Sequence, residues 1–363
     1  MNTTINPTLQ DQTPPPIMAW DVGGAHLKAV RTDAVGQVLA VTQVYCPLWR
    51  GLSVLSAAID QVLAEFTIPS QGHRHCVTMT GELADIFPNR ATGVMQIAQL
   101  LQDKLGEQLQ FYAGYQHWVS LSEAQANTHN IASMNWLASV EYLATQAPNA
   151  LFVDVGSTTT DLVFISHGQP NVKGFSDAQR MQTNELIYTG VVRTPLMALG
   201  QKVNFFNAAI NLAAEHFATT ADVYRLTGDL SQDQYSAETA DGADKSLAAC
   251  ARRIARMIGR DADEWPMADW QALAQAFKAL QLQQIKQAIA GHLMAFDGKT
   301  NVSLIGAGVG DFLLPGLAEE LKLAYLSVTD FMPADSQLSG SAKRMAAVCF
   351  PVYAVAKLGR AHA

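Results

Sequence analysis

The chain has 363 residues, of which 49% are hydrophobic and 15% charged, and it carries a formal net charge of −8. The length is sufficient for two domains of ordinary size, and the composition excludes an intrinsically disordered protein. The acidic balance argues against a general nucleic-acid-binding protein.

Residues 1–16 are polar and end in three prolines. They lack the basic start and the apolar core of a secretory signal, so we expect a short disordered lead. No later apolar run is long enough to cross a bilayer. The four cysteines form no CxxC pair, which fits reduced thiols in a cytoplasm. His73, His75 and Cys76 lack a second ligand pair at zinc-site spacing, which favours a strand-edge cluster over a metal site.

The first half reads as a β-meander followed by alternating helices and strands. We expect strands at 17–22, 27–33 and 37–44, a helix at 51–66, a strand at 75–80, a helix at 91–109, strands at 109–113 and 118–121, and a helix at 135–147. The order βββαβαβα is similar to one half of a ribonuclease-H-like fold.

The second half restarts this pattern and then departs from it. We expect strands at 151–155, 160–166 and 171–175, helices at 207–217, 244–258 and 269–296, strands at 301–305 and 324–328, and helices at 312–322 and 342–358. The late helices predict a helical insertion before the last strand pair. The sequence therefore predicts an α/β protein with a lead (1–16), a first domain (17–149) and a second domain (150–363) that carries an insertion at about 205–298.

An aspartate-glycine turn occurs twice, each time directly after an apolar strand. The copies are residues 21–28 (DVGGAHLK) and 154–161 (DVGSTTTD). A turn of small residues lets backbone N–H groups point at an anion, and the aspartate can hold a metal ion beside it. Two such turns, facing each other across a central cleft, would bind a polyphosphate from both sides.

A third candidate element is the glycine-rich stretch 306–310, which lies between an expected strand and an expected helix. Such a turn allows close approach of a nucleotide or phosphate, and it is equally typical of close helix–strand packing. The predicted phosphate- or nucleotide-binding residues are Asp21, Gly23, Gly24, His26, Lys28, Asp154, Gly156, Ser157, Thr158, Thr159, Asp161, Gly306, Gly308 and Gly310.

Asp21 and Asp154 are the predicted Mg²⁺ ligands, because Mg²⁺ is usually shared between carboxylates, waters and substrate phosphates. The alternative is that each aspartate only caps its own turn. Lys28 could reach a phosphate or could be a solvated strand lysine. Asp161, at the matching position of the second turn, is a possible metal or water ligand.

Several strings along the chain are similar to those of the superfamily of actin, Hsp70 and sugar kinases, and more narrowly to its hydantoinase/oxoprolinase-related branch in one-carbon metabolism. Those strings are residues 20–25 (WDVGGA), 79–83 (MTGEL), 135–136 (NW), 188–195 (YTGVVRTP), 221–224 (ADVY), 239–242 (TADG) and 252–256 (RRIAR). The resemblance covers nearly the whole chain after residue 16.

The resemblance implies two actin-like ATPase domains and a reaction of methanofuran/methylofuran biosynthesis. Characterised members of this branch join a furanylmethyl diphosphate to the phenol oxygen of a tyramine derivative and release diphosphate. A furanylmethyl carbon can bear positive charge as diphosphate leaves, so the reaction needs a diphosphate clamp, a metal ion and a base for the phenol.

The resemblance also implies roles for residues outside the turns. Glu82 and Asp85 follow a strand at the position where the superfamily often keeps a catalytic carboxylate, and capping of the next helix is the competing interpretation. Arg193 would bind diphosphate or a substrate carboxylate. By their i, i+4, i+8 spacing rather than by the resemblance, Arg252, Arg256 and Arg260 share a helix face, which would bind an anionic substrate tail or would be solvated.

One departure from the superfamily concerns the first turn. Kinases of this fold usually carry Thr or Ser after the two glycines, and this chain has Ala25 and His26 there. The change argues against ordinary phosphoryl transfer from ATP. Two alternatives stay open: an ATP-dependent small-molecule kinase or hydantoinase-like amidohydrolase, and a non-enzymatic nucleotide-dependent switch or scaffold. The sequence also leaves open whether the stretch 306–310 binds ATP or the substrate.

Overall fold

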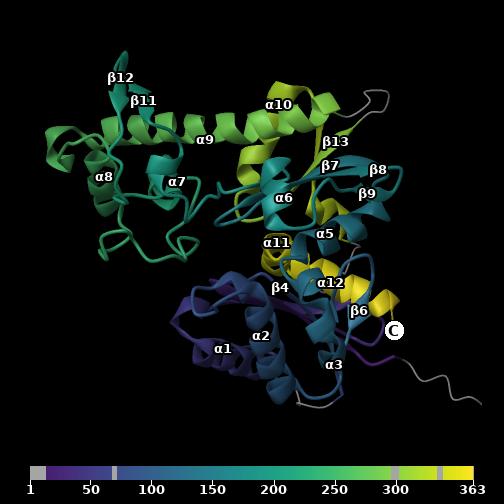
Figure 1. Ribbon diagram of the computed structural model, residues 1–363. Coiled ribbons are helices and arrows are strands. Elements are labelled where there is room, and N and C mark those ends of the chain that lie inside the picture. Colours follow the sequence, from purple (N-terminus) through teal and green to yellow (C-terminus); the bar gives the residue numbers. More distant parts are fainter. Residues whose placement is uncertain (1–13, 68–71, 296–301, 333–337, 363) are drawn as a thin grey trace, which may run out of the picture. The chain divides into compact units, whose positions relative to one another are not determined.

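The computed structural model describes residues 14–67, 72–295, 302–332 and 338–362. These residues divide into two compact units, the first within 1–138, 334–342 and 351–363, and the second within 139–333 and 343–350. Each unit contains a mixed β-sheet and helices (Figure 1), so the predicted α/β class is confirmed. Most of the expected lead, Asn301 and the end of the helix expected at 269–296 lie outside the described residues.

The sheet of the first unit has the strand order β3-β2-β1-β4-β5-β6. Its strands are β1 (Ile17–Val22), β2 (His26–Thr32), β3 (Val38–Tyr45), β4 (Arg74–Met79), β5 (Leu109–Tyr112) and β6 (Trp118–Val119). Strand β1 runs antiparallel to β2 and parallel to β4, and all of its residues are buried. The carboxyl ends of β1 and β4 therefore meet at one edge of the sheet.

Two long helices cover one face of this sheet. Helix α1 (Leu52–Glu65) buries Leu55, Ile59 and Val62, which follow one another at helical spacing. Helix α2 (Arg90–Leu105) is capped at its N-terminus by Asn89, whose side chain accepts a 2.9 Å hydrogen bond from the Thr92 amide. Both helices share a core with buried strand residues. The shorter helices are α3 (Leu121–Ala124), α4 (Thr128–Ile131) and α5 (Asn135–Ala144).

The C-terminal chain consists of two helices, α11 (Gly340–Val348) and α12 (Phe350–Ala361), where the sequence predicted one. Lys357 of α12 donates a 2.9 Å hydrogen bond to the Gly36 carbonyl, so the chain returns to the first unit. Gly359 allows this packing, because a Cβ there would lie 2.5 Å from the sulfur of Cys76.

The sheet of the second unit has the order β10-β8-β7-β13-β14, with β9 also paired to β8. Its strands are β7 (Asn149–Val155), β8 (Thr160–Ser166), β9 (Gln169–Asn171), β10 (Leu186–Ile187), β13 (Ser303–Ala307) and β14 (Ala324–Ser327). The path β9-β8-β7-β13-β14 matches β3-β2-β1-β4-β5 in order and in the direction of each pairing. The two units thus repeat one topology.

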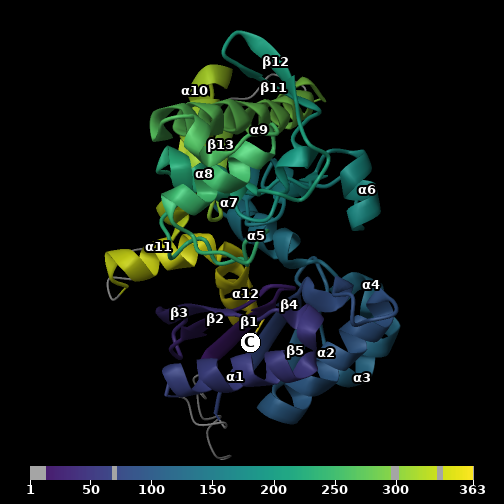
Figure 2. The same ribbon diagram turned by 90° about the vertical axis from the view of Figure 1, so that its left-hand side faces the viewer.

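A largely helical segment, residues 202–295, enters this topology between β10 and β13. Its main helices are α7 (Thr220–Thr227), α8 (Leu247–Arg256) and α9 (Met267–Ala295), and α6 (Asp177–Gln182) precedes it. Helix α9 runs past α7 and α8, and α10 (Leu314–Leu321) lies near its far end (Figures 1 and 2). The described residues of this segment are therefore largely helical.

The helix expected at 207–217 is wrong. Strand β12 (Ala208–Asn211) pairs there with β11 (Lys202–Phe205) as an antiparallel hairpin. The turn residues Phe206 and Asn207 have φ values of 48° and 59°, as a two-residue hairpin turn of the mirror-image type requires. The rings of Phe205 and Phe206 pack on Trp265, and this tertiary contact outweighs the helical pattern of the sequence.

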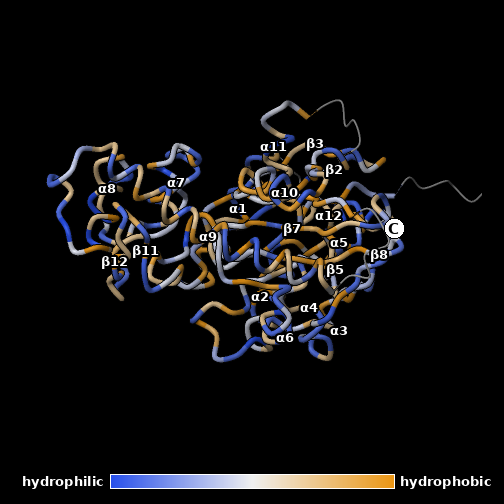
Figure 3. The backbone as a smooth tube through the Cα atoms, turned by 90° about the horizontal axis from the view of Figure 1, so that it is seen from above, coloured by the Kyte–Doolittle hydropathy of each residue, from blue (hydrophilic) through white to orange (hydrophobic). Residues whose placement is uncertain are grey.

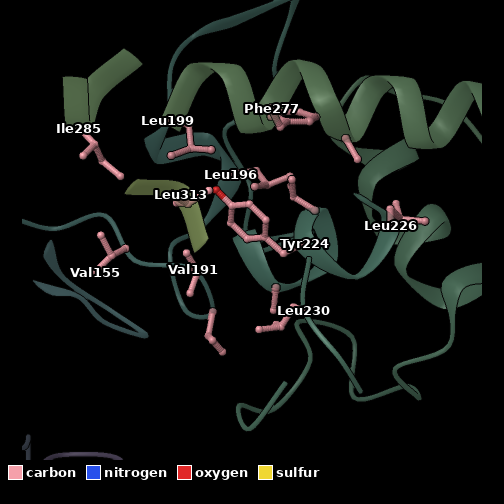
Figure 4. Packing of buried hydrophobic residues seen from close by; sticks show 14 of the residues in the cluster. Val155, Val191, Leu196, Leu199, Tyr224, Leu226, Leu230, Phe277, Ile285 and Leu313 are labelled. Carbon is pink, nitrogen blue, oxygen red and sulfur yellow. The ribbon is translucent and has the colours of Figure 1, made fainter. Parts of the chain in front are cut away.

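The insertion shares one hydrophobic core with the second sheet. Figure 4 shows Tyr224 of α7 among Leu196, Leu199 and Leu313, with Phe277 of α9 above them. Figure 3 shows hydrophobic and hydrophilic residues alternating along the chain in short stretches. In the described ranges, no helix combines the length and the apolar character needed to cross a membrane.

Candidate active site

The two aspartate-glycine turns close in the same way. The Gly23 amide donates to the His26 carbonyl over 3.0 Å, and the Gly156 amide donates to the Thr159 carbonyl over 2.8 Å. Each turn joins the central strand of its sheet to the antiparallel neighbour. The sequence repeat is therefore a repeat of backbone structure.

The carbonyl that precedes each turn is bound in an equivalent way. The Val22 carbonyl accepts from the Thr80 amide (2.9 Å), and the Val155 carbonyl accepts from the Gly310 amide (2.8 Å). Thr80 and Gly310 follow β4 and β13, the parallel neighbours of the two central strands. The segment after the parallel strand thus stabilises the turn in both units.

The second turn has the hydrogen-bonding pattern of an anion site. The Gly156 carbonyl accepts from the Val191 amide (3.1 Å), and the Ser157 carbonyl accepts from Val192 (3.1 Å) and Arg193 (2.8 Å). Among the described residues, the amides of 157–159 donate to no other backbone group. With its carbonyls bound and its amides available, this turn can accept a negatively charged group.

The first turn has a similar hydrogen-bonding pattern, with fewer backbone hydrogen bonds to its carbonyls. The Gly24 carbonyl accepts from the Leu48 amide (2.9 Å), and the Ala25 carbonyl accepts from the Cys46 amide (2.8 Å). The amides of Gly24 and Ala25 donate to no backbone carbonyl of a described residue. A Cβ at Gly24 would meet no atom within 4 Å, so this turn is open on that side.

The carboxylates beside the two turns have different neighbours. Asp21 pairs in register with Lys28, whose Nζ lies 3.5 Å from Asp21 Oδ2. Asp154 pairs in register with Asp161, and Asp161 binds the buried Arg180 over 2.8 Å. Paired residues of adjacent strands point to the same face of a sheet. The second unit thus brings the carboxylates of Asp154 and Asp161 to one face of the sheet, and the guanidinium of Arg180 binds Asp161 there.

Asp21 has a further neighbour that the sequence interpretation missed. Thr78 of β4 is its register partner, and both residues are buried. Asp21 Oδ1 and Thr78 Oγ1 have no hydrogen-bond partner among the described residues. Buried oxygen atoms of this kind on two register partners suit a cation or a metal-bound water. A polar residue near the end of an otherwise buried strand is the signal that could have indicated Thr78.

The two candidate bases, Glu82 and Asp85, lie in different environments. Glu82 is in the short 3₁₀ helix Gly81–Leu83 and is only 1% exposed, whereas Asp85 is exposed. Ser133 Oγ donates a 2.7 Å hydrogen bond to Glu82 Oε1. The cap of α2 is Asn89, so neither carboxylate serves that purpose. Burial and a specific donor favour Glu82 as the functional carboxylate.

Ser133 itself was not predicted as a site residue. It is buried and has a φ of 55°, in the left-handed region that residues other than glycine seldom adopt. Its neighbour Ala132 forms an isolated parallel bridge with Met79 at the end of β4. Nothing in the sequence around residue 133 indicates this contact.

Three glycines of the stretch 306–310 are required by close packing. A Cβ at Gly308 would lie 2.3 Å from Asp154 Oδ1, and a Cβ at Gly310 would lie 2.5 Å from the side chain of Val155. A Cβ at Gly306 would meet Asp311, whose Oδ1 accepts a hydrogen bond from the Tyr325 hydroxyl. Burial raises the pKa of the Asp311 carboxyl, and Asp330 acts in the same direction. Residues 306–310 therefore pack directly beside Asp154.

The predicted substrate arginines are distributed over separate sites. Arg193 belongs to the segment that binds the second turn. Arg252 and Arg256 lie on α8 and approach Asp241 at 3.5 and 3.9 Å, and both are partly exposed. Their buried neighbour Arg253 forms 2.7 Å and 3.0 Å ion pairs with Asp222 and Asp241. Arg253 was not among the predicted substrate-binding residues, and it is completely buried.

The histidines differ in their surroundings. His26 lies at the start of β2, and its ring packs edge-on against Tyr45. His75 is buried, and its Nδ1 accepts a 3.1 Å hydrogen bond from the indole of Trp20. In the part of the chain that the structure describes, no group of three or more His, Cys, Asp and Glu residues could hold a metal ion. A metal at Asp21 or Asp154 would therefore take fewer than three of its ligands from His, Cys, Asp and Glu side chains of the described residues.

The chain is similar to a known protein family, to proteins of known name and to solved structures. The family model for hydantoinase/oxoprolinase matches residues 74–340, which is more than half of the chain. The match includes Glu82, the second turn, the glycine stretch and the whole helical insertion.

Two archaeal proteins are similar in sequence, and both are named (4-{4-[2-(γ-L-glutamylamino)ethyl]phenoxymethyl}furan-2-yl)methanamine synthase. The protein of Methanocaldococcus jannaschii is 28% identical over 246 residues, which cover 68% of this chain and 72% of that protein. The protein of Methanococcus vannielii is 34% identical over 116 residues, which cover 32% of this chain and 52% of that protein.

Among solved structures, nucleotide-free acetone carboxylase is similar in fold, with a TM-score of 0.55 at 11% sequence identity. The similarity covers 85% of this chain and 68% of the other. At this identity the likeness concerns the fold alone.

Proposed function

The chain belongs to the hydantoinase/oxoprolinase family, and we propose that it is a transferase in the biosynthesis of a methanofuran- or methylofuran-type C1 carrier. In the proposed reaction the phenol oxygen of a tyramine derivative attacks the methylene carbon of a furanylmethyl diphosphate. A carbon–oxygen ether bond forms, the carbon–oxygen bond to diphosphate breaks, and the phenol proton leaves. The two archaeal relatives named as synthases support this substrate class.

The structural observation that carries the proposal is the second turn. Its carbonyls are occupied by Val191, Val192 and Arg193, whereas the amides of 157–159 remain available. Diphosphate is a good leaving group only when its developing charge is stabilised, and preorganised amides achieve this without reorganisation. We assign the diphosphate to this turn, with the hydroxyls of Ser157, Thr158 and Thr159 as further donors.

Mg²⁺ fits the residues present in each unit, and we propose Asp21 of the first unit and Asp154 of the second as candidate ligands. Asp21 has a buried oxygen atom without a partner beside Thr78, and Asp154 has the carboxylate of Asp161 as its register partner. Bound Mg²⁺ would neutralise charge on the diphosphate oxygens. Lys28 already neutralises part of the charge on Asp21, so Asp154 is the better single ligand.

Glu82 is our proposed base for the phenol. A buried carboxylate that is oriented by a hydrogen bond from Ser133 can accept the phenol proton as the ether bond forms. Asp85 is exposed and lacks this orientation, so it is the weaker candidate.

A second candidate function is ATP-dependent kinase or amidohydrolase chemistry. The glycine stretch 306–310 beside Asp154 favours it, because close backbone approach of this kind suits a nucleotide. Ala25 argues against it, because the first turn lacks the hydroxyl that usually meets the transferring phosphate. A nucleotide-dependent switch would need the turns but would not need Glu82.

The test is a coupled diphosphate-release assay with the furanylmethyl diphosphate, a tyramine-type phenol and Mg²⁺, without ATP. We expect diphosphate release that depends on the phenol, and an ether product of the corresponding mass. Glu82→Gln should lower kcat about 100-fold or more, whereas Asp85→Asn, its exposed neighbour, should stay near wild type. Phosphate release from ATP with no ether product would instead support the kinase or hydrolase alternative.

A further inference from the structure

We propose that Gln281 of the inserted helix α9 is a positioning residue for the second turn, so that the helical insertion controls the conformation of the anion site. The inference rests on the proposed function only in taking the amides of 157–159 as the diphosphate site.

The first step is the contact between the second turn and the segment 189–194. A Cβ at Gly190 would lie 2.5 Å from both the Ser157 carbonyl carbon and the Thr158 nitrogen. The backbone of Gly190 therefore lies directly on the turn, and the next three amides bind the turn carbonyls. The conformation of 189–194 thus determines where the available amides point.

The second step is what holds Gly190. Its amide donates to Thr194 Oγ1 (2.8 Å), and its carbonyl accepts from Thr220 Oγ1 (2.8 Å) and from Gln281 Nε2 (2.8 Å). Gln281 Nε2 also donates to Thr189 Oγ1 over 2.9 Å. Two of these groups, Thr220 of α7 and Gln281 of α9, belong to the insertion. Two side chains of the insertion therefore hold the segment 189–194, which binds the second turn.

The third step is the fixed orientation of Gln281. Its side chain is completely buried, and its Oε1 accepts a 2.6 Å hydrogen bond from the Tyr224 hydroxyl. Burial raises the pKa of this phenol further above its ordinary value, so the hydroxyl is protonated and donates at physiological pH. With Oε1 and Nε2 both engaged, only one amide orientation satisfies the network. A shift of α9 relative to α7 would therefore change the hydrogen bonds that hold Gly190.

The experiment compares two variants of Gln281 with a control on the same helix. Gln281→Met keeps the side-chain volume and removes all three hydrogen bonds. Gln281→Glu keeps the acceptor for Tyr224 and removes the donor to Gly190, and it serves if the methionine variant folds poorly. Gln284→Met is the control, because Gln284 lies one turn away and binds the Leu199 carbonyl (3.0 Å) instead.

Two readouts are measured on the whole protein: amide hydrogen exchange of peptides that cover 156–160 and 188–194, and affinity for inorganic pyrophosphate with Mg²⁺. We expect both Gln281 variants to accelerate exchange and to weaken pyrophosphate binding by about ten-fold, the change for one typical lost hydrogen bond. Gln284→Met should change neither readout. Thermal unfolding of each variant separates local effects from a general loss of stability.

The outcomes are distinguishable. Unchanged exchange and unchanged affinity in stably folded Gln281 variants would overturn the positioning role. Accelerated exchange in these variants, in a protein whose wild type binds no pyrophosphate, would support the positioning role and reject the diphosphate site of the proposed function. An equal effect of Gln284→Met would also overturn the inference, because the coupling would then not depend on Gln281.

Discussion

Ser133 donates a 2.7 Å hydrogen bond from its hydroxyl to Glu82 Oε1, and it does so from a left-handed backbone conformation with a φ of 55°. Both residues are buried. Backbone strain of this kind persists only where the surroundings determine it, and such positions concentrate at functional sites. The contact joins the segment before α5 to the turn after β4, two regions that the sequence separates by about fifty residues.

The first prediction separates the strain at Ser133 from its hydrogen bond. Ser133→Ala removes the donor and keeps a side chain in the left-handed region, whereas Ser133→Gly removes the donor and relieves the strain. We expect the glycine variant to be more stable than the alanine variant by about 1 kcal/mol in urea unfolding. Both should lower kcat for diphosphate release with little change in KM, because both lose the group that orients Glu82. Equal stability of the two variants would contradict the strain argument.

The second prediction concerns Gly190. Its missing Cβ would overlap backbone atoms of Ser157 and Thr158 at 2.5 Å, so Gly190→Ala must displace the second turn. We expect a loss of about 1–3 kcal/mol in the free energy of unfolding and a loss of pyrophosphate binding. Gly316→Ala is the matched control, because a Cβ at this position of α10 would meet no atom within 4 Å. That variant should be slightly more stable than wild type, and a similar loss in both variants would count against the close contact.

The third prediction distinguishes the arginines of α8. Arg253 and Asp222 are both completely buried and lie 2.7 Å apart, so Arg253→Ala leaves an unpaired buried carboxylate. We expect a destabilisation of about 3–5 kcal/mol, measured by chemical denaturation. Arg252→Ala removes a half-exposed partner of Asp241 and should cost less than about 1 kcal/mol.

The same pair of variants tests the predicted role of the exposed arginines in substrate binding. If Arg252 or Arg256 binds an anionic tail, replacement by alanine raises KM for the phenolic substrate and leaves stability near wild type. An unchanged KM in both variants would mean that these side chains do not bind substrate and only form the surface ion pairs with Asp241.

The fourth prediction is a pH dependence of stability at His75. Burial lowers the pKa of His75 from 6.5 to about 4, with a smaller contribution from His73. The unfolded chain therefore binds more protons than the folded protein between pH 6.5 and pH 4. Stability due to this group is fully present above pH 6.5 and is lost as the pH falls toward 4, by about 3 kcal/mol in total.

The measurement is urea unfolding of wild type and His75→Gln across this pH range. We expect the free energy of unfolding of the variant to fall less steeply with decreasing pH, because the variant has no titrating imidazole at this position. Its stability at pH 7 should be lower if the glutamine amide does not replace the acceptor for the Trp20 indole. If the free energy of unfolding of the variant falls with pH as steeply as that of wild type, groups other than His75 cause the loss of stability in acid.

Local patterns in the sequence were sufficient to predict most strands and helices of both sheets. The apolar run of β1, the helical spacing of α1 and the glycine turns are short-range signals, and the structure contains these elements within a few residues of the predicted bounds. The duplicated turn could also be predicted, because its backbone geometry depends on residues that are adjacent in the chain.

Contacts between distant segments could not be predicted in this way. The hairpin β11–β12 forms in place of a helix because Phe205 and Phe206 pack on Trp265, sixty residues further along the chain. The partners Thr78 for Asp21, Ser133 for Glu82 and Gln281 for Gly190 depend on strand register and on the path of the insertion.

The sequence by itself determined the α/β class, the family and the repeated aspartate-glycine turn, because these follow from local residue order and from strings shared with relatives. Only the tertiary structure decided which carboxylate is buried and oriented, which arginine is paired, and which insertion residue holds the second turn. Burial and hydrogen bonding between segments far apart in the chain give each of these side chains its role, and those properties exist only once the chain has folded.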